Sequence, residues 1–145
     1  MIALIQRVNY AKVVIEGQLY SEIHKGILAL VGVEKNDTSS SADKLLEKIL
    51  AYRIFADSEG KMNLSLRAID ADFMLVSQFT LAATTDKGLR PGFSSAMPPK
   101  EAEEMFDYLV STAKEKYPNV SCGQFAADMQ IALENNGPVT FSLKA

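Results

Sequence analysis

The sequence predicts a single α+β domain in which a curved, mainly antiparallel sheet carries two main helices. Short segments in the first third of the chain alternate apolar and polar residues, as half-buried strands do. Only two long segments repeat apolar residues at helical spacing, which is too few for a doubly wound parallel sheet. The length of 145 residues, with 48% hydrophobic and 23% charged residues, suits one domain with a proper core.

Three strands are expected in the first third of the chain. The alternation runs through residues 2–8 and 13–15, and a turn at residues 16–18 leads into a short strand at 19–23. The continuous apolar run at residues 27–33 is typical of a central strand that is covered on both faces.

The first helix is expected after a loop rich in capping residues. Ser40 followed by Asp43 resembles a capping box. One helical face would be buried, and its residues are Ala42, Leu45, Leu46, Ile49, Leu50 and Arg53. A short strand at Ile54–Phe55, a turn at residues 57–60 and a strand at 73–78 follow.

The second helix is expected to begin at Pro99, after an irregular loop. Residues 83–99 contain three prolines and two glycines, and a loop of this length in a compact domain is more often functional than not. Acidic residues fill the first turns of the helix, as the helix dipole favours, and Pro118 ends it. The last strands are expected at residues 121–124, 129–133 and 139–143.

Composition and charge narrow the classes of partner. No apolar run approaches the roughly 18 residues of a membrane span, and the N-terminus lacks the pattern of a signal peptide. The single cysteine agrees with a reducing compartment, so the cytosol is the default location. The net charge of −3 and pI of 5.2 predict that any RNA is bound through a local patch. Neither a membrane nor DNA is expected as a partner.

The usual catalytic and metal-binding residues are scarce. The chain has no phosphate-binding loop of the GxxxxGK type, no GxGxxG and no CxxC. His24 alone cannot build a zinc site, so a turn residue is the favoured interpretation. Cys122 has no histidine near it in sequence, which favours inert packing over a nucleophile. No cofactor or metal is therefore expected.

Polar side chains interrupt the strand that ends near residue 78. Ser77, Gln78 and Thr80 stand where a core strand would carry apolar residues, so they are expected to have hydrogen-bonding partners. They can satisfy a neighbouring loop, or they can bind a reacting ester. In the second case the backbone amides of Phe79 and Thr80 would stabilise an oxyanion. Thr80 as a covalent nucleophile is the minor alternative, because no base adjoins it in sequence.

A second unusual segment is Asn135–Thr140, which reads NNGPVT. Gly-Pro between two strands favours a hairpin turn. The alternative is a cis peptide bond, which would place carbonyl oxygens side by side where they could accept from an ammonium group.

The two segments together resemble the paired signature of the D-aminoacyl-tRNA deacylases. The pair consists of SQFTL at residues 77–81 and NGPVT at 136–140. The resemblance runs the length of the chain. It includes IQRV at 5–8, LVGVEKNDT at 30–38, segments across 47–66, KGLRPGFSSAMPP at 87–99 and FAADMQI at 125–131.

The resemblance implies a hydrolase that cuts the ester between a D-amino acid and the terminal adenosine of tRNA, and that also clears mischarged glycine. It implies a homodimer with active sites at the interface. Gly137-Pro138, cis in the family, would enter the pocket of the other subunit, accept from the α-amino group and reject an L side chain. The ribose 2′-OH of the substrate would help to activate the attack.

The same resemblance assigns roles to the residues of the first segment. Ser77 would hydrogen-bond near the Gly-Pro element. Gln78, Phe79 and Thr80 would line the scissile ester, with backbone amides as oxyanion donors.

Three further residues have two interpretations each. Phe125 and Met129 would wall the adenine pocket, or they are core residues on a strand. Arg7 would brace the Gly-Pro loop, or it is a solvated charge on a strand.

The chain departs from many relatives after SQFTL. Where they read YADTRKGRRP, this chain reads AATTDKGLRP, and Lys87 and Arg90 are the cations that remain. Fewer phosphate contacts predict weaker and less salt-dependent tRNA binding. Two alternatives stay open: a non-catalytic dimer that binds an RNA end or a small ligand, and an esterase with Thr80 as its nucleophile.

Overall fold

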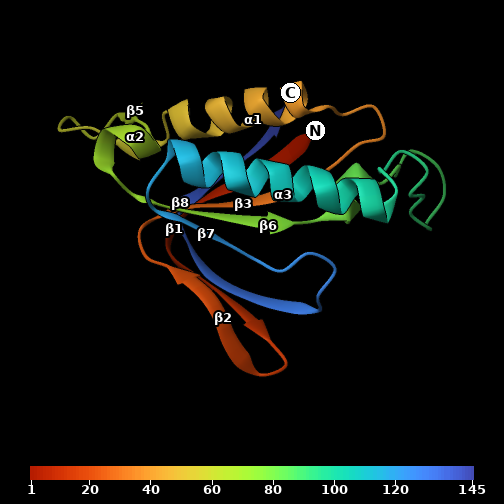
Figure 1. Ribbon diagram of the computed structural model, residues 1–145. Coiled ribbons are helices and arrows are strands. Elements are labelled where there is room, and N and C mark those ends of the chain that lie inside the picture. The colour runs from red at the N-terminus through yellow and green to blue at the C-terminus, as the bar shows by residue number, and fades with distance from the viewer.

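A computed structural model describes residues 1–145. Two long helices, α1 (Ser39–Ala51) and α3 (Pro99–Lys116), lie side by side on one face of a curved sheet (Figure 1). The α+β class predicted from the sequence is confirmed. None of the helices combines the length and the apolar character needed to cross a membrane.

The main sheet has six strands in the order β2-β1-β3-β6-β7, and β8 pairs with β1. β1 binds β8 along one edge, while its other edge is shared between β3 and β2. The hairpin of β1 and β2 curves away from the helices together with part of β8 (Figure 1). The strands are β1 (Ile2–Ile15), β2 (Gln18–Ile23), β3 (Gly26–Gly32), β6 (Asp72–Ser77), β7 (Val120–Cys122) and β8 (Met129–Lys144).

The sheet is mixed rather than uniformly antiparallel. β1 is antiparallel to β2, β3 and β8, but β3 is parallel to β6, and β6 is parallel to β7. Parallel neighbours need a crossover connection. α1 lies in the crossover from β3 to β6, and α3 lies in the crossover from β6 to β7. Both helices therefore return over the same face of the sheet.

The expected hairpin turn near Pro138 is wrong. Residues 129–144 form the single strand β8, which pairs with β1 from end to end. The pairing skips between Val8, opposite Asn135, and Gln6, opposite Thr140. The residues between them bulge out of the ladder, so Gly137-Pro138 lies on a bulge within a strand.

Of the small elements between α1 and α3, only one strand was predicted. The short strand expected at Ile54–Phe55 is β4 (Phe55–Ala56), and it pairs with β5 (Met62–Leu64). A one-turn helix, α2 (Leu66–Ile69), follows β5. Phe79 and Thr80 do not extend the strand, because β6 ends at Ser77 and the 3₁₀ helix η1 (Phe79–Ala82) begins two residues later.

Two apolar clusters hold the sheet. The larger contains 24 buried residues between the helices and the sheet, and the smaller contains seven on the opposite face. β3 contributes Ile27 and Ala29 to the first and Leu28 to the second, which confirms that it is covered on both faces. β3 and β6 approach closely at Gly26, where a Cβ atom would lie 1.9 Å from the Asp72 carbonyl oxygen. The amino end of β6 is thereby held close to β3.

Candidate functional site

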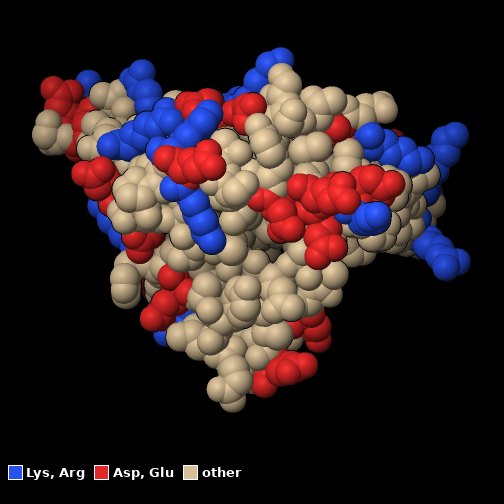
Figure 2. Space-filling view, in the orientation of Figure 1, with Lys and Arg blue, Asp and Glu red and all other residues tan.

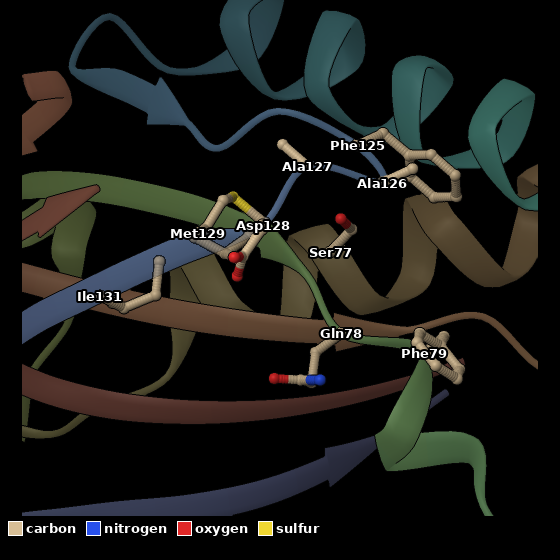
Figure 3. A pocket seen from close by; sticks show the side chains of 10 residues that line it. Ser77, Gln78, Phe79, Phe125, Ala126, Ala127, Asp128, Met129 and Ile131 are labelled. Atoms are coloured by element: carbon tan, nitrogen blue, oxygen red, sulfur yellow. The ribbon is translucent and has the colours of Figure 1, made fainter. Parts of the chain in front are cut away.

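A cavity of about 300 Å³ opens where β6 ends. One side is the end of β6 and the start of η1, and the other is the segment that leads into β8 (Figure 3). The Ser77 hydroxyl and the Asp128 carboxylate point toward the space between the two segments (Figure 3). The lining residues are Val76, Ser77, Gln78, Phe79, Phe125, Ala126, Ala127, Asp128, Met129 and Ile131.

Gln78 and Thr80 form one hydrogen-bonded unit beside this cavity. The Gln78 backbone amide donates to the Val31 carbonyl at 2.7 Å, which ties the turn to β3. The Gln78 side-chain amide donates to Thr80 Oγ1 at 2.6 Å. Thr80 is exposed and does not line the cavity. Since an amide N–H is a donor and not a base, the structure gives the Thr80 hydroxyl no group that could activate it.

The start of η1 also offers free backbone donors. The first hydrogen bond of this helix runs from the Leu81 amide to the Gln78 carbonyl at 3.2 Å. The amides of Phe79 and Thr80 precede it and donate no bond within the helix. Two adjacent amides of this kind are suited to hold a developing negative charge.

Phe125 and Met129 lie between the cavity and the core. Each is half-buried and lines the cavity. Phe125 also packs against Phe106 of α3, with ring centroids 6.1 Å apart, and Met129 packs against the smaller apolar cluster. Each side chain therefore anchors the cavity wall in the core while one side faces the opening.

Arg7 contacts the Gly-Pro bulge directly. Its Nε donates to the Asn136 carbonyl at 2.9 Å, and its Nη1 donates to the Ile54 carbonyl at 2.6 Å. The guanidinium thus links the bulge to the segment before β4 and is no free surface charge. The Gly137-Pro138 peptide bond is cis, as the resemblance implies.

The bulge is held from within as well. The Asn135 side chain accepts from the Val139 amide at 2.7 Å and donates to Thr140 Oγ1 at 2.8 Å, which closes the loop across its base. Only glycine fits at position 137: its φ is +144°, and a Cβ atom would lie 2.6 Å from Val139 Cγ2. Gly137 and Pro138 are exposed and line no part of the cavity of their own chain.

The long loop between η1 and α3 carries the remaining cations. Thr84 and Gly92 exchange backbone hydrogen bonds of 2.8 and 3.1 Å, so the residues between them form a projecting tip. Asp86, Lys87 and Arg90 line a polar depression there, and basic side chains project at this end while acidic ones cover α3 (Figure 2).

His24 and Cys122 take no part in these features. His24 is exposed, and its backbone amide donates to the Asp72 carboxylate at 2.8 Å. Cys122 is a free, half-buried residue of β7. The sequence interpretation missed Asp128, the one titratable side chain that lines the cavity. The only sequence signal for it was its place within FAADMQI.

The chain is similar in sequence to known proteins over nearly its whole length. A sequence profile of the family described as D-Tyr-tRNA(Tyr) deacylase matches residues 4–144. A protein of Pseudomonas syringae pv. syringae named D-aminoacyl-tRNA deacylase is 57% identical, and the match covers 97% of each chain.

Two solved structures share the fold over nearly their whole length. One, titled c-Myc DNA Unwinding Element Binding Protein, is 35% identical with a TM-score of 0.96, covering 100% of this chain and 99% of its own. The other, titled as a probable eukaryotic D-amino acid tRNA deacylase, is 15% identical with a TM-score of 0.81 and 98% coverage of both chains. It supports the fold alone. The profile match and the 57% identity mean that the chain belongs to the D-Tyr-tRNA(Tyr) deacylase family of hydrolases.

Proposed function

We propose that the chain hydrolyses the ester between a D-amino acid, or glycine, and the 3′-terminal adenosine of tRNA, within the cytoplasmic pool of charged tRNA. The products are the free amino acid and intact tRNA. Membership of the family supports the reaction class. The cavity at the end of β6 supports the location, because it combines an apolar wall with the polar ends of Ser77, Gln78 and Asp128.

The reaction needs no covalent intermediate. A water molecule attacks the ester carbonyl carbon, the amides of Phe79 and Thr80 stabilise the oxyanion, and the bond to the ribose oxygen then breaks as that oxygen takes up a proton. The neighbouring 2′-OH of the substrate assists the attack. Gln78 orients the ester and Thr80, while Phe125 and Met129 hold the adenine. Preorganised donors of this kind supply a large part of the acceleration in acyl transfer.

Chirality is selected by the Gly-Pro bulge of a second subunit. A homodimer would insert this bulge into the cavity of its partner, where backbone carbonyls accept from the α-amino group and the bulge excludes an L side chain. Selection by exclusion suits the task, because D and L esters offer the same groups for attraction. The observation that carries this step is the bulge itself: it is exposed, lies outside the lining of its own cavity and is held by Arg7 and Asn135.

The first test compares hydrolysis of D-Tyr-tRNA and L-Tyr-tRNA by the purified protein. Loss of the D ester alone is the expected result, with Gly-tRNA as a third substrate that is also cleaved. Binding of tRNA without loss of either ester would contradict the proposal and favour a non-catalytic protein that binds RNA ends.

The second test asks whether each site is shared between subunits. Ala127→Phe fills the cavity, and Arg7→Ala removes the contact that holds the bulge, so each variant alone should lose activity. A mixture that has been unfolded and refolded together should recover about a quarter of the wild-type activity, because half of the dimers are mixed and each of those has one intact site. No recovery, although mixed dimers are detected, would show that each site lies within one chain.

A further inference from the structure

A second hollow adjoins the cavity on the outer side of Phe79. We call it the outer groove; it encloses about 460 Å³ and is lined almost entirely by apolar residues. It shares Phe79, Phe125 and Ala126 with the cavity, so the two hollows are adjacent and have these residues as a common wall. Its lining residues are Phe79, Phe93, Ala96, Met97, Pro98, Pro99, Ala102, Phe125 and Ala126.

Two aromatic rings stand exposed at the entrance of the outer groove. Phe79 is 59% exposed and Phe93 is 43% exposed, although large apolar side chains normally lie inside. Their ring centroids are 5.1 Å apart, and the planes are inclined by 58°. The angle leaves faces of both rings open rather than covering one with the other.

The outer groove is preformed, because backbone contacts hold the loop that carries Phe93. The Lys35 amide donates to the Ser95 carbonyl at 3.0 Å, and the Met97 amide donates to the Val33 carbonyl at 3.0 Å. The Ser95 hydroxyl donates to the Ala82 carbonyl, which ties the loop to η1. A ligand would not have to order this segment on binding.

Two cations lie on the same loop as Phe93. Phe93 directly follows Gly92, one of the two residues that close the projecting tip. Lys87 and Arg90 lie on that tip, beyond the aromatic entrance. Aromatic faces next to a cationic track are the usual means of binding single-stranded nucleic acid, since bases stack on the rings while phosphates contact the cations.

We propose that the outer groove binds the nucleobase that precedes the terminal adenosine of the substrate, stacked on Phe93, with its phosphates directed toward Lys87 and Arg90. The assignment rests on the proposed function, which places the terminal adenosine in the adjoining cavity. A single-stranded nucleic acid fits the site better than a peptide, because the open ring faces and the cations occur together. The site therefore binds any second base by stacking and does not distinguish bases by their hydrogen-bonding edges.

The test uses three D-tyrosyl esters of increasing length: adenosine alone, the dinucleotide CpA and the trinucleotide CpCpA. The measured quantity is the ratio of kcat/KM for the dinucleotide ester to that for the adenosine ester. Stacking of one base predicts a ratio of about 5 to 140 for the wild type. Extension to the trinucleotide should add less, because the next base lies beyond the aromatic rings.

Variants at position 93 separate stacking from simple apolar contact. Phe93→Ala should bring the ratio toward unity, and Phe93→Tyr should retain it, since a phenol ring stacks as well. Phe93→Leu keeps an apolar side chain without a ring and should also lower the ratio. The adenosine ester, which does not reach Phe93, is the internal reference for folding and chemistry in every variant.

Failure of this inference is distinguishable from failure of the proposed function. Equal kcat/KM for the adenosine and dinucleotide esters in the wild type would overturn the nucleobase site while leaving the deacylase reaction intact. If no ester is cleaved, the affinities of unacylated CpA and of adenosine are measured by calorimetry instead. Equal affinities would overturn the nucleobase site. A Phe93→Ala variant that dissociates into monomers but keeps the ratio would assign the groove to a subunit contact and overturn it as well.

Discussion

Thr80 and Gln78 illustrate how single residues limit the chemistry. The hydroxyl of Thr80 accepts from the Gln78 amide, and no group that could remove its proton contacts it in the structure. A threonine that acts as a nucleophile needs such a base. The pair is better suited to hold the first turn of η1, where the amides of Phe79 and Thr80 begin the helix.

Thr80→Val removes the hydroxyl while keeping the shape of the side chain. We expect kcat/KM for D-Tyr-tRNA to fall by about tenfold or less, the cost of one net hydrogen bond. Loss of an obligatory nucleophile would instead cost on the order of 10⁶-fold. Single-turnover hydrolysis measures the difference, with Thr80→Ser as the control that restores a hydroxyl. Detection of a tyrosyl adduct on Thr80 by mass spectrometry would overturn the assignment.

At the scale of elements, the loop between η1 and α3 combines a fixed base with a projecting tip. Its base is tied to β3 and η1, while its tip is closed only by the pairing of Thr84 with Gly92. Leu89, where relatives carry a basic residue, is fully exposed on the tip and contributes no charge. The electrostatic contribution of this loop to tRNA binding therefore depends on Lys87 and Arg90.

The double variant Lys87→Gln, Arg90→Gln should reduce the salt dependence of tRNA binding. Each phosphate contact of a single strand contributes a slope of about 0.7 in a plot of log affinity against log salt concentration, so two lost contacts should reduce the slope by about 1.4. Equilibrium titrations over a salt series measure it. Lys61→Gln, next to β5 at the other end of the molecule (Figure 1), is the control with the same charge change and should leave the slope as it was. An unchanged slope in the double variant would place the tRNA elsewhere.

β8 shows how far the sequence could predict an element. Its two halves were predicted from their apolar content, but Gly137-Pro138 between them was interpreted as a hairpin turn. The true arrangement depends on β1, a strand far away in the sequence, which pairs with both halves. The parallel direction of β3, β6 and β7 was not predicted either, because it also depends on pairing between distant parts of the chain. The apolar run of β3 indicates burial on both faces, whichever way its neighbour runs.

Sequence motifs predicted some residues of the candidate site. Residues whose role depends on their position at the rim of a hollow were missed. The Ser77–Thr80 segment was singled out by its polar side chains and Gly137-Pro138 by its turn chemistry, and the resemblance to a family then assigned their expected roles. Asp128 and Phe93 were not singled out, because an aspartate in a loop and a phenylalanine near prolines are ordinary in sequence. Their significance comes from lying at the rim of a hollow, which only the assembled fold creates.

At the scale of the whole molecule, one carboxylate connects the three helices that cover the sheet. Glu47 of α1 binds Arg67 of α2 at 2.9 Å and Lys116 of α3 at 3.1 Å. The hydrogen bond from Arg67, followed by that from Lys116, holds the pKa of Glu47 below its ordinary value. A carboxyl group whose pKa is lowered by folding stabilises the fold above its unfolded pKa, and this contribution is lost as the pH falls through the folded value.

Glu47→Gln should therefore lower the melting temperature slightly at neutral pH and leave it less sensitive to acid. The wild type should lose this contribution below about pH 4.3, the ordinary pKa of glutamate, where the two proteins should converge. Because all three side chains are partly exposed, the effect should be small. Thermal unfolding across pH 3 to 8 (about the range that brackets this pKa) measures it. Glu59→Gln, whose partner is the neighbouring Lys61 on an exposed turn, is the matched control.

The pairing of β8 with β1 has a consequence for how the protein is made. β1 leaves the ribosome well before β8, the strand that binds its long edge. Met129 of the cavity wall and the Gly-Pro bulge both belong to that late strand. A nascent chain thus carries an unpaired edge and an incomplete cavity until β8 has emerged.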